Sequence, residues 1–368
     1  MIAEELTRFG IDSTRNTCTH PWAYAKEMLQ RVSRTFALNI RVLPGVRLGR
    51  PILLAYLFCR MADTVEDSPH LPAQEKVRLL ELFARIFSHT QFSWHDAAAA
   101  FVTALPSSWL QSEDDEEFLC AHCAWVIDLY FALPKKVQMP IEQCVREMCD
   151  GMGRFALRQE SQAGQWLTIE DEADLDQYCY FVAGVVGNML CDLFYAQSPF
   201  INNARHQRMR QLAVSFGLGL QLVNIIKDAM EDSVRNVCFI PMEWLREEGF
   251  MHPAELFSAQ ADEGARQRVM HKIISKAWRH LQDALDYTVL IPALEPRLRL
   301  FCQWPMLMAA ETLTGAGNGT VLFKPDQKLK ISRADVKRII RQSSMWCWTN
   351  SWIKRRFAAL SSTKTAQQ

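Results

Sequence analysis

The sequence has no excess of charge of either sign and no signal for export. Its 41 lysine and arginine residues equal its 41 aspartate and glutamate residues, so the overall charge does not indicate nucleic-acid binding. Residues 1–16 are polar and mixed in charge, unlike a secretory signal peptide. We therefore expect a cytoplasmic protein that does not bind nucleic acid.

The chain also lacks a long uninterrupted hydrophobic run. Its longest apolar stretch, residues 181–190, contains Asn188 and is followed by Asp192. A membrane-spanning helix needs roughly 20 predominantly apolar residues. We interpret this stretch as a buried helix and expect a soluble protein, or one that contacts a membrane only at its surface.

The cysteines also show no spacing typical of a disulfide framework. Eleven cysteines are scattered through the sequence, which is typical of reduced, buried thiols rather than a disulfide framework. The segment CAHC at 120–123 has no second ligand pair at zinc-finger spacing, so we interpret it as part of a core helix.

Strand-like alternation is scarce, and residues 320–323 are the only short candidate. Apolar periodicity separated by proline and glycine instead predicts helices. These cover about 22–42, 51–66, 73–88, 115–131, 141–159, 172–196, 205–231, 264–289, 297–314 and 334–357.

The predicted fold is all-α. No linker divides the chain, so we expect one domain over residues 1–368, with a core of about 22–335 and a C-terminal helix and tail over 336–368. The expected architecture is a helical bundle around a central apolar cavity. Helix-interrupting glycines either let helices approach closely or leave room for a ligand, and the sequence leaves both open. They are Gly184, Gly187, Gly217 and Gly219.

Two acidic motifs stand far apart in this apolar chain. Residues 63–67 read DTVED and residues 228–232 read DAMED. In a helix, carboxylates at i, i+3 and i+4 share one face, and like charges at that spacing are destabilising. A divalent cation bound through oxygen offsets the repulsion, and Mg²⁺ commonly combines carboxylates with substrate phosphates. The pair predicts a diphosphate held through Mg²⁺, with Mn²⁺ as an alternative ion.

A solvated helix face with surplus charge would explain either motif alone. However, each motif ends an apolar run, over 51–61 and 218–226, and each has a basic neighbour, Arg60 or Lys227. The repetition of this context favours a functional role.

Four blocks resemble the squalene/phytoene synthase family, in the family's order. They are SRTF at 33–36, YxxxRxxDxxED at 56–67, YCYFVAGVVG at 178–187 and QxxNIIKDxxED at 221–232. The resemblance covers about residues 22–335. It implies the isoprenoid synthase fold, dependence on Mg²⁺ and head-to-head condensation of two prenyl diphosphates. The block at 178–187 is more similar to the squalene synthase branch than to the carotenoid branch.

The resemblance also implies roles for individual residues. The metal ligands would be Asp63, Asp67, Asp228 and Asp232, with Glu66, Glu231 and Asn224 in support. Substrate contacts would be Ser33, Arg34, Tyr56, Arg60, Gln221 and Lys227, and Tyr178 would handle a proton. Lys227 departs from the family pattern, which usually has arginine there, and lysine lacks the bidentate fork.

A nicotinamide cofactor is implied by two further similarities. The segment KLKISR at 328–333 resembles the basic loop that squalene synthases place over the cofactor phosphates, and Phe301-Cys302 falls where they carry a Phe-Cys pair. NADPH would then contact Lys328, Lys330, Arg333 and Phe301. A solvated loop and ordinary core packing explain the same residues, and no GxGxxG fingerprint is present.

The implied reaction converts two farnesyl diphosphates through presqualene diphosphate to squalene, with reduction by NADPH. Without hydride delivery, the same chemistry gives a dehydrosqualene or phytoene type of product. A terpene cyclase acting on one prenyl diphosphate would share the metal motifs. A non-catalytic assembly factor usually loses these motifs, and a plain helical interaction module explains neither.

The C-terminal segment combines aromatic and basic residues. Trp346, Trp348 and Trp352 precede the cluster KRRF at 354–357, a pattern of helices that lie on anionic lipid. A helix packed on the protein with a solvated basic end is the alternative. The spanning anchor of eukaryotic relatives is not seen, so we expect a bacterial-type form, with peripheral contact to the inner membrane as an open option.

Overall fold

The structure, a computed structural model, describes residues 11–12, 17–88, 93–161, 166–323 and 329–362. It is almost entirely helical, which confirms the predicted fold class. The chain divides into two compact units, unit 1 over residues 1–160 and unit 2 over residues 161–368, and each is described by itself. The expectation of one domain around a central cavity stays a prediction.

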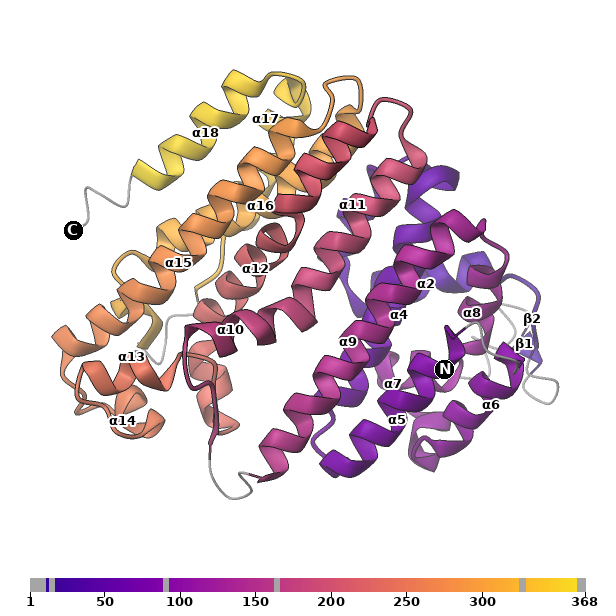
Figure 1. Cartoon of the computed structure of the whole chain (residues 1–368), viewed down its shortest axis with the longest axis horizontal. Helices are drawn as coiled ribbons and strands as arrows, with labels where there is room; N and C mark the ends of the chain where they lie inside the picture. The colour runs from indigo at the N-terminus through magenta and orange to yellow at the C-terminus, as the bar shows by residue number, and fades with distance from the viewer. Residues whose placement is uncertain (1–10, 13–16, 89–92, 162–165, 324–328, 363–368) are drawn as a thin grey trace. The chain divides into compact units, whose positions relative to one another are not determined.

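Unit 1 consists mainly of helices (Figure 1). A two-residue antiparallel ladder joins β1 (Ile11–Asp12) to β2 (Thr17–Cys18). The α-helices are α2 (Pro21–Val32), α3 (Arg34–Arg41), α4 (Arg50–Asp67), α5 (Ala73–Ile86), α6 (Trp94–Ala104), α7 (Asp115–Ala121), α8 (Ala124–Phe131) and α9 (Lys135–Ser161). A π-helix, η1 (Gly45–Gly49), leads into α4, and a 3₁₀-helix, η2 (Ser107–Gln111), precedes α7.

Aromatic rings fill the core of unit 1 beside α4. Phe58 of α4 meets Phe87 and Tyr130 edge-on, with ring centroids 4.9 and 5.6 Å apart. Phe83 of α5 extends the cluster. Such edge-to-face contacts add to the stabilisation from burial. They fix the helix whose last turns carry the first acidic motif.

Unit 2 contains longer helices and one short parallel ladder, β3 (Leu167–Thr168) with β4 (Val237–Cys238). Its helices are α10 (Glu172–Cys179), α11 (Val185–Gln197), α12 (Asn203–Val234), α13 (Met242–Glu247), α14 (Pro253–Phe257), α15 (Glu263–Leu290), α16 (Pro296–Ala316), α17 (Arg333–Trp346) and α18 (Asn350–Ser362). A π-helix, η3 (Tyr180–Gly184), joins α10 to α11, and a 3₁₀-helix, η4 (Thr320–Phe323), follows α16.

Glycine allows the backbone of α12 to touch α11 and η3. A Cβ on Gly187 would lie 2.0 Å from the carbonyl oxygen of Ala213, and a Cβ on Gly217 would lie 2.3 Å from that of Ala183. No side chain fits at either position. The structure therefore assigns these two glycines to close helix packing, one of the two explanations that the sequence left open.

Two helical stretches, residues 172–197 and 203–234, are long and apolar enough to cross a membrane by length and composition alone. About half of each apolar window is buried within the protein. Their glycine-mediated contact with each other is that of core helices, so this observation carries no argument for membrane insertion.

Three predicted helices are interrupted. Ser33 adopts an extended conformation and caps α3, its Oγ accepting from the Phe36 amide at 3.3 Å. Residues 122–123 separate α7 from α8. Between α17 and α18, the Cys347 carbonyl accepts hydrogen bonds from Arg299 and Gln303 instead of continuing a helix.

Residues 320–323, the one short strand candidate in the sequence, form a 3₁₀-helix instead. Gly317 and Gly319 have positive φ angles of 55° and 91° and turn the chain. The Leu322 amide then donates to the Gly319 carbonyl at 3.1 Å. None of the eleven cysteines, all of which lie within the described residues, forms a disulfide.

Adding one methyl group at the contact between η3 and α12 should destabilise unit 2. We expect Gly217→Ala to cost about 1–3 kcal/mol, a fall in Tm of roughly 2–10 °C. Circular dichroism during heating measures this. Gly153→Ala is the control, because its Cβ would meet Val77 at an ordinary 3.6 Å. An unchanged Tm for Gly217→Ala would contradict the packing account.

Candidate active site

The first acidic motif occupies the last turns of α4. Thr64 and Val65 face the core, whereas Asp63 and Glu66 are half-buried and Asp67 is exposed. Carboxylates at the C-terminal end of a helix meet its partial negative charge, which adds to their mutual repulsion. The Lys76 ammonium donates to the Glu66 carbonyl and satisfies part of this end.

Arg60 lies at the centre of the polar face of α4. It donates to the Tyr56 hydroxyl at 3.2 Å and lies 3.8 Å from the Asp63 carboxylate and 3.7 Å from Glu116 of α7. These ion pairs are long, and the Arg60 Nε is buried without a hydrogen-bond partner. The guanidinium thus retains donor capacity that an oxyanion would satisfy.

The start of α3 lies beside the same face. The ring of Phe36 packs on Tyr56 with centroids 4.8 Å apart, and Ser33 caps this helix. Unit 1 therefore brings Ser33, Tyr56 and Arg60 to one region, as the resemblance implies. The side chain of Arg34 lies outside the part of the chain that the structure describes.

Burial and crowding shift the titration of Asp63. Removal from water raises the pKa of this carboxyl to about 7; Arg60 opposes the rise, while Asp67 and Glu116 add to it. Burial likewise raises the pKa of Glu116. Carboxylates gathered with too little compensating charge are a donor set that fits a hard divalent cation. The carboxylates of the first motif are therefore a donor set that fits Mg²⁺.

The second acidic motif lies near the C-terminal end of α12. Asp228 is partly exposed and pairs with Lys227 at 3.1 Å. Asp232 is buried and accepts from Arg235 at 2.6 Å. Four-residue spacing places Asn224, Asp228 and Asp232 on one stripe of the helix. Exposed or partly exposed neighbours on this part of α12 are Gln221, Asn224, Lys227 and Glu231.

Tyr178 lies close to this second motif. Its ring stacks on Phe239 with centroids 4.3 Å apart, and Phe239 directly follows Cys238. Burial raises the pKa of Cys238 to about 12, and the nearby charge of Asp232 adds to the rise. Unit 2 thus brings Tyr178 and Asp232 to the same neighbourhood through β4. The π-helix η3 begins just after Tyr178, and such π segments are frequent at functional sites.

A buried lysine holds the helix that carries Tyr178. Lys276 of α15 is 3% exposed, and its ammonium lies 2.7 Å from Glu172 and 2.8 Å from Asp176, both on α10. Breaking such a buried pair leaves an uncompensated charge, so the link is rigid. Its effect is to fix α10 on α15.

The residues implied for NADPH differ in their exposure to solvent. Lys330 and Arg333 are exposed at the start of α17, where Ser332 caps the helix. Phe301 is 5% exposed, and its ring meets Phe194 edge-on at 6.0 Å. Lys328 lies outside the described residues.

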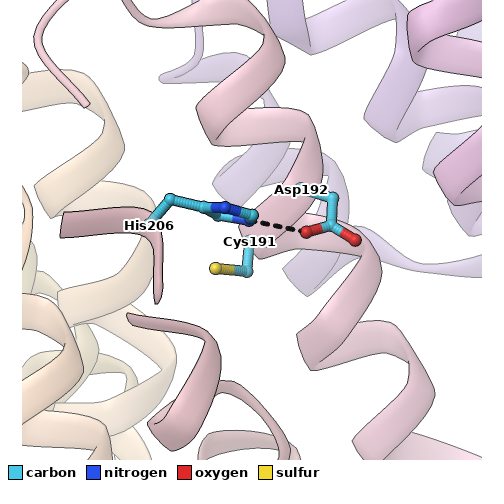
Figure 2. Close-up of side chains that lie close together, drawn as sticks. All are labelled: Cys191, Asp192 and His206. Atoms are coloured by element: carbon cyan, nitrogen blue, oxygen red, sulfur yellow. Dashed lines mark hydrogen bonds and ion pairs between the residues drawn. The ribbon is translucent and has the colours of Figure 1, made fainter. Parts of the chain in front are cut away.

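Cys191, Asp192 and His206 form another cluster of possible ligand atoms, all within 4.8 Å of one another (Figure 2). His206 Nε2 lies 2.7 Å from one oxygen of Asp192, and Arg210 donates to the other. The Arg210 charge opposes a divalent cation, and both carboxylate oxygens are already engaged. We interpret the cluster as an ionic link between α11 and α12.

Several contributors carry no signal that sequence analysis could use. Glu116 reaches Arg60 from a helix about 55 residues away in sequence, and Lys276 reaches α10 across about 100 residues. Phe239 lies outside every recognised block. Only the acidic turn at 113–117 preceding an apolar stretch could have drawn attention to Glu116.

Comparison with known proteins identifies relatives over most of the chain. The squalene/phytoene synthase family model matches residues 29–334. Squalene synthase 1 of Arabidopsis thaliana is 29% identical over 311 residues, which cover 84% of this chain and 68% of that protein. Squalene synthase of Solanum lycopersicum is also 29% identical, with the same coverage.

Solved structures share the fold. TcSQS in complex with the ligand BPH1237 has a TM-score of 0.72 at 24% identity, covering 94% of this chain and 98% of that one. A dehydrosqualene synthase in complex with a ligand has a TM-score of 0.56 at 20% identity, covering 89% of this chain and 96% of that one.

Asp63→Asn should stabilise the metal-free protein at high pH. A carboxyl whose folded pKa is raised to about 7 disfavours folding increasingly as pH rises from about 4 to 7, and fully above 7. We expect a gain in Tm of about 2–4 °C at pH 8 in EDTA, discounted for partial exposure, and about a third of that gain at pH 5.

Asp335→Asn provides a control with the opposite sign. Its hydrogen bond from Ser332 lowers the pKa of Asp335, so its stabilising contribution is complete above pH 4. The same small loss of Tm should therefore appear at pH 5 and pH 8. Equal effects of Asp63→Asn at both pH values would show that the raised pKa is wrong.

Proposed function

Because the chain belongs to the squalene/phytoene synthase family and is a prenyltransferase, we propose that it joins two farnesyl diphosphates head to head through presqualene diphosphate to squalene. One observation carries the proposal. Two helices that are far apart in the sequence, α4 and α12, each carry an intact DxxED motif after an apolar run, at or near the C-terminal end. Each motif would bind Mg²⁺ together with substrate diphosphate.

Asp63 and Asp67, together with Asp228 and Asp232, would hold Mg²⁺, with Glu66, Glu231 and Asn224 in support. The bound ion would supply stabilisation of the charge that develops on the departing diphosphate. Arg60 and Lys227 contribute positive charge that is oriented before reaction, which is the effective form of electrostatic catalysis. The partnerless Nε of Arg60 supports this role.

The first coupling step breaks the carbon–oxygen bond to diphosphate in the donor. The resulting allylic cation bonds to the 2,3-double bond of the acceptor, and loss of one proton closes the cyclopropane. Tyr178 or the released diphosphate accepts that proton. A phenol near neutral pH is a weak base, so we propose diphosphate as the final acceptor and Tyr178 as the positioning group. Its stacking on Phe239 restricts the ring.

Apolar surroundings must keep water from the cation, because water would convert it to an alcohol. Phe181 in η3 is half-buried beside Tyr180, with ring centroids 5.5 Å apart. Aromatic faces of this kind stabilise cations. Lys276 fixes α10, and α10 leads directly into this aromatic turn.

The second half of the reaction would use NADPH, which supplies hydride to the final cation. Exposed Lys330 and Arg333 at the start of α17 fit the cofactor phosphates by charge. One observation favours a second candidate, coupling without reduction: Phe301 is buried against Phe194 rather than presented to a ligand.

The identity of the hydrocarbon distinguishes these reactions. Incubation with farnesyl diphosphate and Mg²⁺ should give squalene with NADPH, and presqualene diphosphate or a dehydro product without it. Mass spectrometry of the extracted product measures this. A dehydrosqualene product in both reactions would select the non-reductive candidate, and a cyclised C15 product would overturn head-to-head coupling.

Neutralising either acidic motif should abolish turnover. We expect Asp63→Asn with Asp67→Asn, and separately Asp228→Asn with Asp232→Asn, to reduce kcat by at least about 100-fold, because each removes charge that holds the metal. Asp150→Asn, at an exposed carboxylate paired with Arg154, is the control. Near-normal turnover by either double variant would contradict the proposed metal site.

A further inference from the structure

Three turns lie at the same end of unit 2 (Figure 1), and each carries large apolar side chains that are exposed. Phe200, between α11 and α12, is 46% exposed, and Leu294, between α15 and α16, is 69% exposed. At the junction of α17 and α18, Trp346 and Trp348 are 47% and 54% exposed, and Met345 is 50% exposed. Exposed apolar residues gathered in this way indicate an interaction surface.

Hydrogen bonds hold the three turns together. The Ser198 hydroxyl donates to Glu295 at 2.5 Å, which joins the first turn to the second. Arg299 joins the second turn to the third, because it donates to the Ile291 carbonyl at 2.8 Å and the Cys347 carbonyl at 2.9 Å. The exposed side chains therefore belong to one connected surface, which we call the apolar end.

Arg299 makes the turn between α17 and α18 rigid. This turn carries Trp346 and Trp348, and we call it the tryptophan turn. It is 2% exposed, and it also donates to Asn350 at the start of α18, at 2.6 Å. An unpaired charge at that depth is costly, so its multiple acceptors hold the turn firmly. Cys347 points inward, 1% exposed, while the tryptophans on either side point outward. Their exposure is thus fixed by the fold.

The apolar end is surrounded by positive charge. Its segments 198–208, 291–299 and 341–355 contain one acidic residue, Glu295, which is already bonded to Ser198. Exposed basic side chains lie within the same segments, at Arg208, Arg297, Arg341, Lys354 and Arg355. No ion pair to a carboxylate of the described residues engages these five. Since the whole chain has no net charge, this is a local segregation of charge.

We infer that the apolar end binds the surface of an anionic lipid bilayer. Tryptophan prefers the boundary between headgroups and acyl chains, and basic residues around it add attraction to anionic lipid. A rigid set of turn residues can insert without ordering a flexible segment. This reading differs from a C-terminal helix lying on the membrane, because Ile353, Phe357 and Leu360 of α18 pack inward.

The surface is remote from the second acidic motif. The apolar end adjoins the first residue of α12, and Asp232 lies near its last residue. At 1.5 Å per residue, these positions are about 45 Å apart along the helix. Changes at the apolar end can therefore be tested without altering the proposed catalytic residues.

Vesicle co-sedimentation of the full chain tests the inference. The protein should sediment with phosphatidylcholine vesicles containing phosphatidylglycerol at low salt and remain in the supernatant with phosphatidylcholine alone. Trp346→Ser with Trp348→Ser should weaken binding about tenfold or more. Arg341→Gln with Lys354→Gln should weaken it about fivefold per removed charge. Circular dichroism confirms that each variant is folded.

Met251→Ser is the matched control, because Met251 is 69% exposed in the turn before α14; it should bind like the unmodified protein. Phe200→Ser with Leu294→Ser tests the apolar end without touching the tryptophan turn and should weaken binding as well. Three results would overturn the inference: no sedimentation with anionic vesicles, binding that survives both apolar double variants, or a change from oligomer to monomer in these variants, which would assign the surface to a protein contact.

Discussion

Direct backbone contact of α12 with α11 and η3 is the constraint on which unit 2 depends. It exists because Gly187 and Gly217 present no side chain where Ala213 and Ala183 need the space. One end of α12 carries the second acidic motif, and the other adjoins the apolar end. η3 leads back to α10 and Tyr178. These contacts of α12 therefore set the positions of the proposed metal ligands of the second motif, of the candidate proton carrier and of the turns that we assign to lipid.

The two acidic motifs lie in electrostatically unfavourable positions. Both acidic motifs lie at helix C-termini, where the helix dipole opposes negative charge, and Asp63 also lies in surroundings that raise its pKa. These features lower the stability of the metal-free protein, and a bound divalent cation would offset the same repulsion. The same physical effect thus explains a local weakness of the fold and the function that we propose for it.

Most helices could be predicted from apolar periodicity and from proline and glycine, because these signals are local. Some failures have local causes that periodicity does not show, and one arises where a partner distant in sequence competes for the backbone. Arg299 captures the Cys347 carbonyl and ends α17, which hydrophobic spacing gives no reason to expect. Likewise, the 3₁₀-helix at 320–323 follows from two glycines with positive φ angles rather than from strand propensity.

The sequence by itself determined the fold class, the family and the residue types available for metal, diphosphate and proton, because these depend on short motifs and their order. Only the tertiary structure decided which side chains surround them. Glu116 beside Arg60, Phe239 on Tyr178 and Lys276 under α10 all come from elements distant in the chain. Contacts of this kind depend on how helices pack, and a helix shows its apolar face in its sequence but not the neighbour that covers it.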